Sequence, residues 1–393
     1  MKSDKKIAVF AGDFFWSTSP YESLDVFRGI SRHFDCDFIM FKDDIRLNKN
    51  FTGKEKFYFD KLLFQNANNL KVIKDWDGFS LISHDYDLIL VSTHIAPKTR
   101  WPGPKDLHSF RSSIGTKMVA WDIGGADILT TAVHYADYFF TKGPIWTEWL
   151  TKMGKKAFTT GAPQYDYFLD DAKRQEDLCT TESDFKEKYS INDEKQKILV
   201  LPSNPSTSTH HQQLRQNMSC LQYLCDLEDV QVLVKTYPND YIFHEKAGWY
   251  TGIYKRPFPP WDGHHGTQYE YLKKKFPSVT VIESQDHHDA MKYSDKIFNI
   301  AGSHVAWETL FTKSKSFTMN FSNKTYFAQP RSVLKHGLDF VKFPDAELNF
   351  EIQSPKEALL DFEVNKDACK DFVLKEYSVP NMVQAINKIL SLR

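Results

Sequence analysis

Val279–Leu310 has the sequence V-T-V-I-E-S-Q-D-H-H-D-A-M-K-Y-S-D-K-I-F-N-I-A-G-S-H-V-A-W-E-T-L, and its pattern indicates the architecture of the chain. Apolar, β-rich runs at Val279–Ile282 and Lys296–Ile300 predict two strands, and the capped run Asp286–Tyr293 between them predicts a helix. Gly302-Ser303 is a turn of small residues that opens a further helix. Strands that alternate with helices in this way are typical of a parallel sheet covered on both faces.

The turn at Gly302-Ser303 also predicts a ligand site. Small residues between a strand and a helix leave backbone N–H groups free, and the positive end of the helix favours a phosphate there. Glu308 follows one to two turns into the helix, where a carboxylate can accept hydrogen bonds from sugar hydroxyls. Together with His304, these residues predict a site for a sugar carried on a nucleotide.

The same alternation extends along most of the chain. In the first part, strands are expected at Ile7–Ala11, Cys36–Phe41, Leu88–Ser92, Met118–Trp121, Tyr138–Thr141 and Ala157–Thr160. In the second part they are expected at Ile198–Leu201, Val230–Lys235, Val279–Ile282, Lys296–Ile300 and Ser316–Asn320. We therefore expect an α/β protein with two Rossmann-like, doubly wound domains facing a cleft. The expected boundaries are 1–168, a polar helical connector at 169–197, 198–365, and C-terminal helices at 366–393 that pack back toward the first domain.

Size and charge narrow the possibilities. At 393 residues the chain is too long for one ordinary core, which favours two domains. The net charge of −1 argues against nucleic acid as a partner, because binding along a phosphate backbone requires a basic surplus. No run approaches the roughly 20 apolar residues of a membrane span. The five cysteines are scattered, which fits a reducing cytoplasm.

Four segments resemble motifs of the glycosyltransferases that have two Rossmann domains, the GT-B fold. They are Thr160–Asp166 (T-G-A-P-Q-Y-D), Ile198–Asn204 (I-L-V-L-P-S-N), Leu233–Pro238 (L-V-K-T-Y-P) and Gly302–Leu310. The first is similar to the segment that closes the first domain of these enzymes, and the second to the first strand and loop of their nucleotide domain. The third is similar to a K-x-H-P segment at the donor phosphate, and the fourth to a turn of small residues before a helical Glu. The chain most resembles two groups of bacterial surface-polysaccharide enzymes. One group is the Kdo and sialic-acid transferases, which use CMP-sugars, and the other is the CDP-glycerol transferases that build teichoic acid.

The resemblance implies that the second domain binds the donor nucleotide. The residues that it assigns to the donor are Ser203, Asn204, Ser206, Lys235, Tyr237, Pro238, Gly302, Ser303, His304 and Glu308. Lys235 is expected to neutralise phosphate charge. One position departs from the family pattern, because the His of its H-P pair is Tyr237 here. A tyrosyl hydroxyl offers the phosphate a hydrogen bond but no positive charge.

Asp122 is the first candidate for a catalytic base. It follows an apolar run and precedes Ile123-Gly124-Gly125, a turn expected to leave the carboxylate at the edge of the sheet. Transfer to a hydroxyl requires a group that takes its proton. The resembling sialyltransferases carry an acidic residue before a Gly at this place, whereas the teichoic-acid enzymes carry a His. The alternative is that Asp122 only caps the following helix.

Five further residues complete the candidate site. Glu148 and Asp240 are acids that would provide the nucleophile if the reaction proceeded through a covalent adduct. The alternative for each is a solvated surface carboxylate. Gly12-Asp13 and His94 follow two strands of the first domain and are expected to approach the acceptor.

Three His-His pairs raise the question of a metal: His210-His211, His264-His265 and His287-His288. Adjacent side chains point apart on strands and helices, and no H-x-x-x-H or H-E-x-x-H pattern accompanies the pairs. The sequence therefore predicts no metal, and no cofactor apart from the nucleotide-sugar co-substrate.

The expected function is the metal-independent transfer of a sugar. The expected donor is CMP that carries Kdo or a related acid sugar, and the expected acceptor is a glycan or glycolipid of a capsule or of lipopolysaccharide. Two enzymes of the same fold remain as alternatives, a CDP-polyol phosphotransferase of the teichoic-acid type and a UDP-sugar 2-epimerase-like enzyme. A catalytically inactive binding subunit is a third alternative. The expected location is the cytoplasm, where the protein is either free or associated peripherally with the inner membrane or with other transferases.

Overall fold

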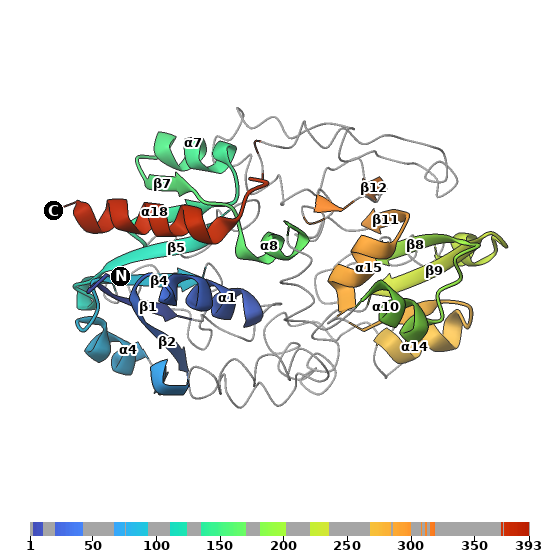
Figure 1. Ribbon diagram of the computed structural model, residues 1–393, viewed down its shortest axis with the longest axis horizontal. Coiled ribbons are helices and arrows are strands. Elements are labelled where there is room, and N and C mark those ends of the chain that lie inside the picture. The colour runs from blue at the N-terminus through green and yellow to red at the C-terminus, as the bar shows by residue number, and fades with distance from the viewer. Residues whose placement is uncertain are drawn as a thin grey trace, which may run out of the picture. The chain divides into compact units, whose positions relative to one another are not determined.

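The computed structural model describes residues 3–10, 20–41, 67–74, 76–92, 111–123, 135–169, 181–201, 221–235, 268–283, 286–299, 308, 311–312, 315–318, 371 and 373–392. The chain divides into two compact units. The first comprises Met1–Lys173, Arg331–Val341 and Lys370–Arg393, and the second comprises Arg174–Pro330 and Lys342–Cys369. Each unit is built around its own parallel sheet (Figure 1).

The first unit contains a 7-stranded sheet in the order β3-β2-β1-β4-β5-β6-β7. Its strands are β1 (Lys6–Phe10), β2 (Asp35–Phe41), β3 (Leu70–Ile73), β4 (Leu88–Ser92), β5 (Lys117–Ile123), β6 (Tyr138–Thr141) and β7 (Lys156–Thr159). Every pairing is parallel. The strand order reverses between β1 and β4, as it does in doubly wound sheets.

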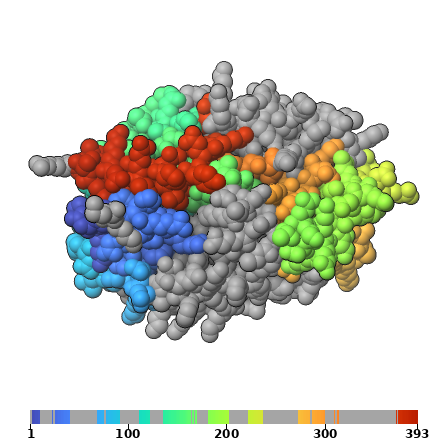
Figure 2. All heavy atoms as spheres, viewed as in Figure 1, coloured from blue at the N-terminus to red at the C-terminus, as the bar shows by residue number. Residues whose placement is uncertain are grey.

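Helices pack against this sheet and one another. They are α1 (Pro20–Ser31), the short 3-10 helix η2 (Ala67–Asn69), α4 (Trp76–Ser83), α7 (Pro144–Lys152), α8 (Pro163–Leu169) and α18 (Ser378–Ser391). The last helix, α18, packs on α1, and its atoms cover the surface beside the α1 region in Figure 2. Val26 and Ile30 of α1 share a core with Met382, Ile386 and Ile389 of α18, all fully buried.

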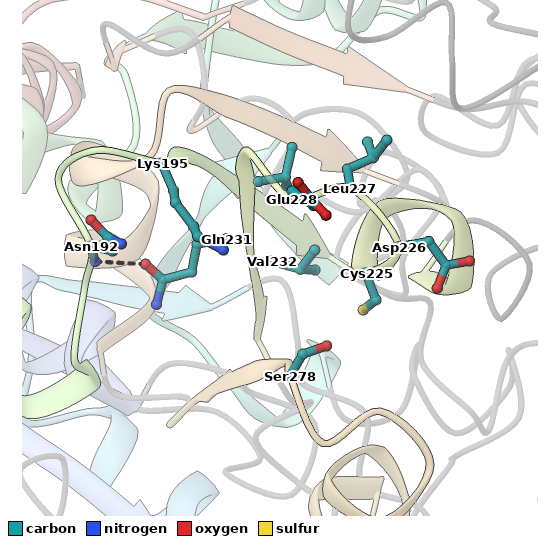
Figure 3. Close-up of a pocket in the computed structure, with 10 residues that line it drawn as sticks. Asn192, Lys195, Cys225, Asp226, Leu227, Glu228, Gln231, Val232 and Ser278 are labelled. Carbon is teal, nitrogen blue, oxygen red and sulfur yellow. Dashed lines mark hydrogen bonds between the residues drawn. The ribbon is translucent and has the colours of Figure 1, made fainter.

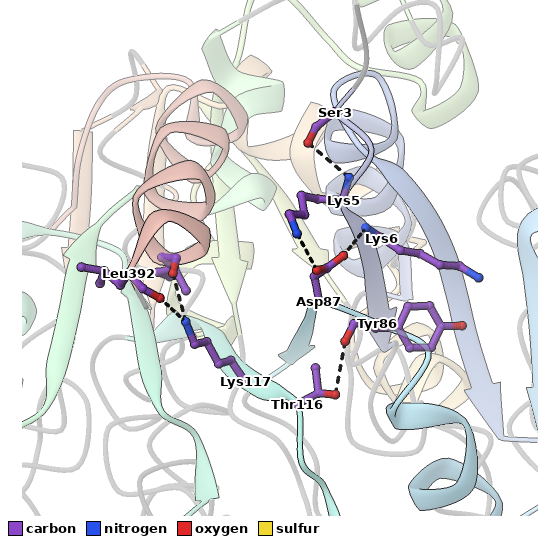
Figure 4. Close-up of polar contacts among 9 residues, drawn as sticks. Ser3, Lys5, Lys6, Tyr86, Asp87, Thr116, Lys117 and Leu392 are labelled. Carbon is purple, nitrogen blue, oxygen red and sulfur yellow. Dashed lines mark hydrogen bonds and ion pairs between the residues drawn. The ribbon is translucent and has the colours of Figure 1, made fainter.

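Polar contacts fix both ends of α18 to the first unit. At its start, Ser378 donates from its backbone N–H (3.0 Å) and its hydroxyl (2.9 Å) to the buried carboxylate of Asp166 on α8. At its end, the Lys117 ammonium on β5 donates to the carbonyl of Leu392 at 2.6 Å (Figure 4). A cation at a helix C-terminus also interacts favourably with the helix dipole. The chain therefore returns to the unit in which it began.

The second unit contains a 5-stranded parallel sheet in the order β10-β9-β8-β11-β12. Its strands are β8 (Gln196–Leu201), β9 (Val230–Lys235), β10 (Thr280–Ile282), β11 (Lys296–Asn299) and β12 (Lys315–Thr318), and its helices are α10 (Glu182–Tyr189), α14 (Gln268–Lys275) and α15 (His287–Tyr293). The order reverses between β8 and β11. One core cluster includes Ile198 and Val200 of β8, Val234 of β9 and Leu272 of α14.

The expected fold class is confirmed, since both units contain a doubly wound parallel sheet. Two details differ from expectation. The edge strand β3 was not expected, and β5 continues past Trp121 to Ile123, so Asp122 lies within the strand and not in a turn after it. The domain boundaries drawn from the sequence stay a prediction.

No helix among the described residues is both long enough and apolar enough to cross a lipid bilayer.

Candidate functional site

The topology of the second unit brings the expected donor segments to one edge of its sheet. Strands β9, β8 and β11 are adjacent and parallel, so their carboxyl ends lie at the same edge. Doubly wound sheets bind ligands at this edge, beside the point where the strand order reverses. The expected donor residues that follow these strands but lie outside the described residues are Ser203, Asn204, Ser206, Tyr237, Pro238, Gly302, Ser303 and His304. Lys235 and Glu308 are described.

Lys235 is the last residue of β9, where it pairs in register with Ile282 of β10 and is partly buried. Its Cα position therefore matches the expectation of a lysine at the carboxyl end of a strand. A lysine at this edge can present its ammonium to an anion while its alkyl stem stays packed.

Glu308 lies in a helical segment and is only 8% exposed. Glu308 is therefore not an ordinary exposed helix residue. Its Oε2 lies 3.4 Å from Nε2 of His287 at the start of α15. The ring of His288 also approaches, with its centroid 3.9 Å from that of His287. The sequence argument that adjacent histidines point apart is wrong for this pair, since one ligand atom of each lies within 4.8 Å of the other and of a carboxylate oxygen of Glu308.

A hydrogen-bond network holds the start of α15. Asp286 is 1% exposed, and its Oδ2 accepts hydrogen bonds from the Tyr189 hydroxyl (2.5 Å) and the Lys188 ammonium (2.7 Å) of α10. Lys188 also binds Glu283, just after β10, at 2.7 Å. Burial and the hydrogen bond to Asp286 raise the pKa of Tyr189 far above its usual value, so the phenol stays a donor. The network therefore positions the segment that carries His287.

In the first unit, strands β1, β4 and β5 are adjacent and parallel. The acceptor candidates Gly12, Asp13 and His94 follow β1 and β4 in the sequence and lie outside the described residues. Asp122 is the second-last residue of β5. The register between β5 and β6 shifts between Ala120 and Ile123, so Asp122 lies in an irregular stretch of the sheet. Bulges of this kind re-aim side chains and are frequent beside active sites.

Glu148 has the surroundings of a surface residue. It is the fifth residue of α7, its side chain is 60% exposed, and it pairs with Lys152 one turn later at 2.6 Å. Asp240, the other acid proposed as a nucleophile, lies outside the described residues.

A pocket of about 340 Å³ lies at the opposite edge of the second sheet (Figure 3). Its lining includes Lys195, Val230 and Ser278, which precede or begin strands β8, β9 and β10. The thiol of Cys225 lines it as well, and burial raises the pKa of this thiol. The sequence analysis did not single out this pocket, and its position at the amino ends of the strands separates it from the expected donor segments.

Comparisons with known proteins agree with this architecture. No family model matches the sequence, and no curated protein matches it. Among solved structures, the UDP-GlcNAc 2-epimerase from Methanocaldococcus jannaschii is similar at 12% identity and a TM-score of 0.57, over 98% of this chain and 99% of that one. The UDP-GlcNAc-bound 2-epimerase from Neisseria meningitidis is similar at 12% identity and a TM-score of 0.51, over 98% and 99%.

A wall teichoic acid polymerase, the H444N variant of TagF, is similar at 11% identity and a TM-score of 0.51, over 98% of this chain and 89% of that one. At such low identities these similarities bear on the fold. They support a GT-B-like fold with two Rossmann-like domains, as the sequence predicts. Nothing in them singles out CMP or Kdo.

Proposed function

We propose that the protein is a glycosyltransferase that uses a nucleotide-sugar donor. The carrying observation is the buried carboxylate of Glu308, which follows β11 beside the point where the strand order of the second sheet reverses. Ligands of doubly wound sheets bind at such points. A buried carboxylate near such a point is suited to accept hydrogen bonds from vicinal hydroxyls of a ribose or sugar.

The proposal assigns roles to the remaining candidates. Lys235 at the end of β9 neutralises charge on the donor phosphate, assisted by the segments around Ser203 and Ser303. Asp122 takes the proton from the acceptor hydroxyl, with the acceptor bound by the first unit. The acceptor is a growing surface glycan or glycolipid, and the acid sugar carried on CMP remains the expected donor. In this scheme, positioning and stabilisation of the leaving phosphate supply most of the rate.

Calorimetry with CMP, CDP, UDP and GDP tests the proposal on the full chain. One nucleotide is expected to bind, and Glu308→Gln is expected to weaken it by about tenfold or more, since a charged hydrogen bond is worth roughly 1.5–3 kcal/mol. Glu187→Gln is the matched control, because Glu187 is exposed on α10 of the same unit. Failure to bind any of the four nucleotides would favour the inactive binding subunit instead.

A UDP-sugar 2-epimerase is the second candidate, favoured by the similarity to two UDP-GlcNAc 2-epimerase structures. Such an enzyme acts on a nucleotide sugar without any acceptor. Incubation with UDP-GlcNAc alone, followed by NMR of the sugar ring, separates the two functions. Appearance of the C2 epimer would replace the transferase proposal, whereas an unchanged sugar is expected.

A further inference from the structure

Three potential metal ligands converge in the second unit. They are the imidazoles of His287 and His288 in the first turn of α15 and the carboxylate of Glu308 beyond β11. One ligand atom from each residue lies within 4.8 Å of the other two. Two ligands of a tetrahedral zinc ion, each at roughly 2.0–2.1 Å from the metal, are themselves about 3.4 Å apart. The distance between His287 Nε2 and Glu308 Oε2 is 3.4 Å.

A cation beside Glu308 would offset the cost of burying its carboxylate. The residue is 8% exposed, and its Oε2 is fully buried and accepts no hydrogen bond from the part of the chain that the structure describes. Burial of an ionised carboxylate is costly unless a cation or hydrogen-bond donors compensate it. The Nε2 of His287 lies 3.4 Å from this oxygen, and the imidazole contributes a positive charge only when it is protonated.

We propose that His287, His288 and Glu308 bind a zinc ion. Two imidazoles and one carboxylate form a ligand set that zinc accepts, and the fourth position is then left to water or a ligand. Magnesium and calcium prefer oxygen ligands, so two histidines disfavour them. This site differs from the sequence expectation of a metal-free protein, and the convergence of His287 and His288 is the observation that changes it.

The surrounding structure supports such a site. The two histidines directly follow Asp286, which Lys188 and Tyr189 hold by hydrogen bonds of 2.7 and 2.5 Å. The backbone that carries two of the three ligands is therefore fixed before a metal arrives. Preorganised ligands bind a metal more tightly, since less ordering is needed on binding.

The site would also orient Glu308, a consequence that rests on the proposed function. A carboxylate can bind zinc through one oxygen and accept a hydrogen bond through the other. With Oε2 on the metal, the second oxygen remains for a hydroxyl of the donor. In this arrangement the ion holds a binding residue in place, and no bond-breaking step is assigned to it.

The test uses the full chain after removal of metal with a chelator. Zn²⁺ is titrated by calorimetry, and Co²⁺ is titrated by visible absorption, where a tetrahedral site gives intense d–d bands. Wild type is expected to bind one ion tightly. Glu308→Gln and His287→Gln are each expected to weaken Zn²⁺ binding by about 100-fold and to remove the Co²⁺ bands, because even indirect partners of a ligand are worth 10–100-fold in affinity.

His33→Gln is the control, since His33 is an exposed histidine of the first unit. Its affinity for Zn²⁺ and its Co²⁺ spectrum are expected to match those of wild type. The chain has 14 His and 5 Cys, so binding elsewhere has to be distinguished. Thiolate charge-transfer bands, or unchanged binding in both Glu308→Gln and His287→Gln, would overturn the proposal. So would the absence of any saturable binding by wild type.

The outcome is separable from that of the proposed function. Metal titrations are made without nucleotide, and nucleotide titrations are repeated on metal-free protein. Loss of zinc binding in His287→Gln with retained, weaker nucleotide binding supports both proposals. If wild type binds a nucleotide but no zinc, the zinc proposal alone is contradicted. If it binds zinc but no nucleotide, the donor-site proposal alone is contradicted. Thermal unfolding of each variant establishes that the change is local.

Discussion

Asp122 lies within a strand and not, as the sequence predicted, in a turn after one. It lies inside β5, in the stretch where the register with β6 shifts between Ala120 and Ile123. An extra residue in one strand turns side chains away from their regular alternation. The catalytic role of Asp122 stays a prediction.

Replacing Asp122 with Asn is expected to abolish sugar transfer and to leave nucleotide affinity unchanged, because an amide cannot take a proton from the acceptor. The loss in kcat is expected to be about 100-fold or more, the usual contribution of a general base. Single-turnover assays and calorimetry with the same nucleotide measure the two quantities. Turnover at the wild-type rate would remove Asp122 from the mechanism.

Asp87 illustrates a charge that acts on stability. Its carboxylate accepts hydrogen bonds from the backbone N–H of Lys6 and the ammonium of Lys5, both at 2.9 Å (Figure 4). Partial burial alone would raise the pKa of Asp87, but these contacts outweigh it and hold the pKa below its usual value. A carboxyl with a lowered pKa in the folded state stabilises the protein above its unfolded pKa and loses this contribution as the pH falls.

Asp87→Asn is therefore expected to lower the free energy of unfolding of the first unit by about 1 kcal/mol at pH 7, a value reduced by solvent screening. The difference from wild type is expected to shrink as the pH falls below about 4, the ordinary aspartate pKa, and to vanish once Asp87 is protonated. Urea unfolding at several pH values measures it, with Asp85→Asn as an exposed control. A difference that does not change with pH would contradict the assignment.

For single residues, the sequence predicted that Glu308 and Lys235 lie at the edge of the second sheet, because strand ends and turns of small residues can be recognised from neighbouring residues alone. It could not predict the contact between His287 and Glu308. The two residues are far apart along the chain, and their distance depends on how β10, β11 and α15 pack.

Among the elements, the contact between α1 and α18 has a steric explanation. A Cβ added to Gly29 of α1 would lie 2.5 Å and 2.6 Å from the two γ-carbons of Val379 on α18. A distance this short forces a shift, and valine has little rotamer freedom in a helix. Glycine at position 29 therefore permits the close approach.

Gly29→Ala is expected to lower the free energy of unfolding of the first unit by about 1–2 kcal/mol, because overpacking exceeds the gain in helix propensity of up to about 1 kcal/mol. Adding Val379→Ala removes the clashing methyl groups. The free energy of unfolding of the double variant is expected to be about 1 kcal/mol higher than the value obtained by adding the effects of the two single substitutions. Strict additivity in urea unfolding would show that the helices are not in tight contact here.

Short and exposed elements were the least predictable. β3 is an edge strand of four residues, Leu70–Ile73, in which Val72 is exposed and Ile73 is buried, so it lacks the continuous apolar run of the central strands. The central strands β1, β4 and β8 were predicted within two residues of their observed ends. Buried parallel strands are apolar on both faces, which makes them visible in a sequence.

For the whole molecule, the alternation of strands and helices was enough to predict two doubly wound sheets. The first unit also contains α18 from the far end of the chain. The sequence predicted that the C-terminal helices of 366–393 pack back toward the first domain, although an amphipathic pattern alone shows an apolar face and not the surface that covers it.

A chain that ends at Tyr377 is expected to lose the ordered structure of its first unit. It lacks Met382, Ile386 and Ile389, whose burial contributes about 2–5 kcal/mol each against a typical net stability of about 5–15 kcal/mol. Limited proteolysis with mass spectrometry measures the result. Cleavage is expected within residues 3–169, with the segments 181–201 and 268–299 protected. Equal protection of both units would show that α18 is dispensable.

The return of α18 to the first unit also bears on how the protein is made. A ribosome finishes all the strands of the second sheet before it synthesises the helix that covers α1. The later unit can therefore reach its native state while the earlier one still lacks part of its core, in contrast to the usual N-terminal-first order of domain folding. During that interval the apolar stripe of α1 is open to solvent, where a holdase chaperone that recognises nascent chains would bind.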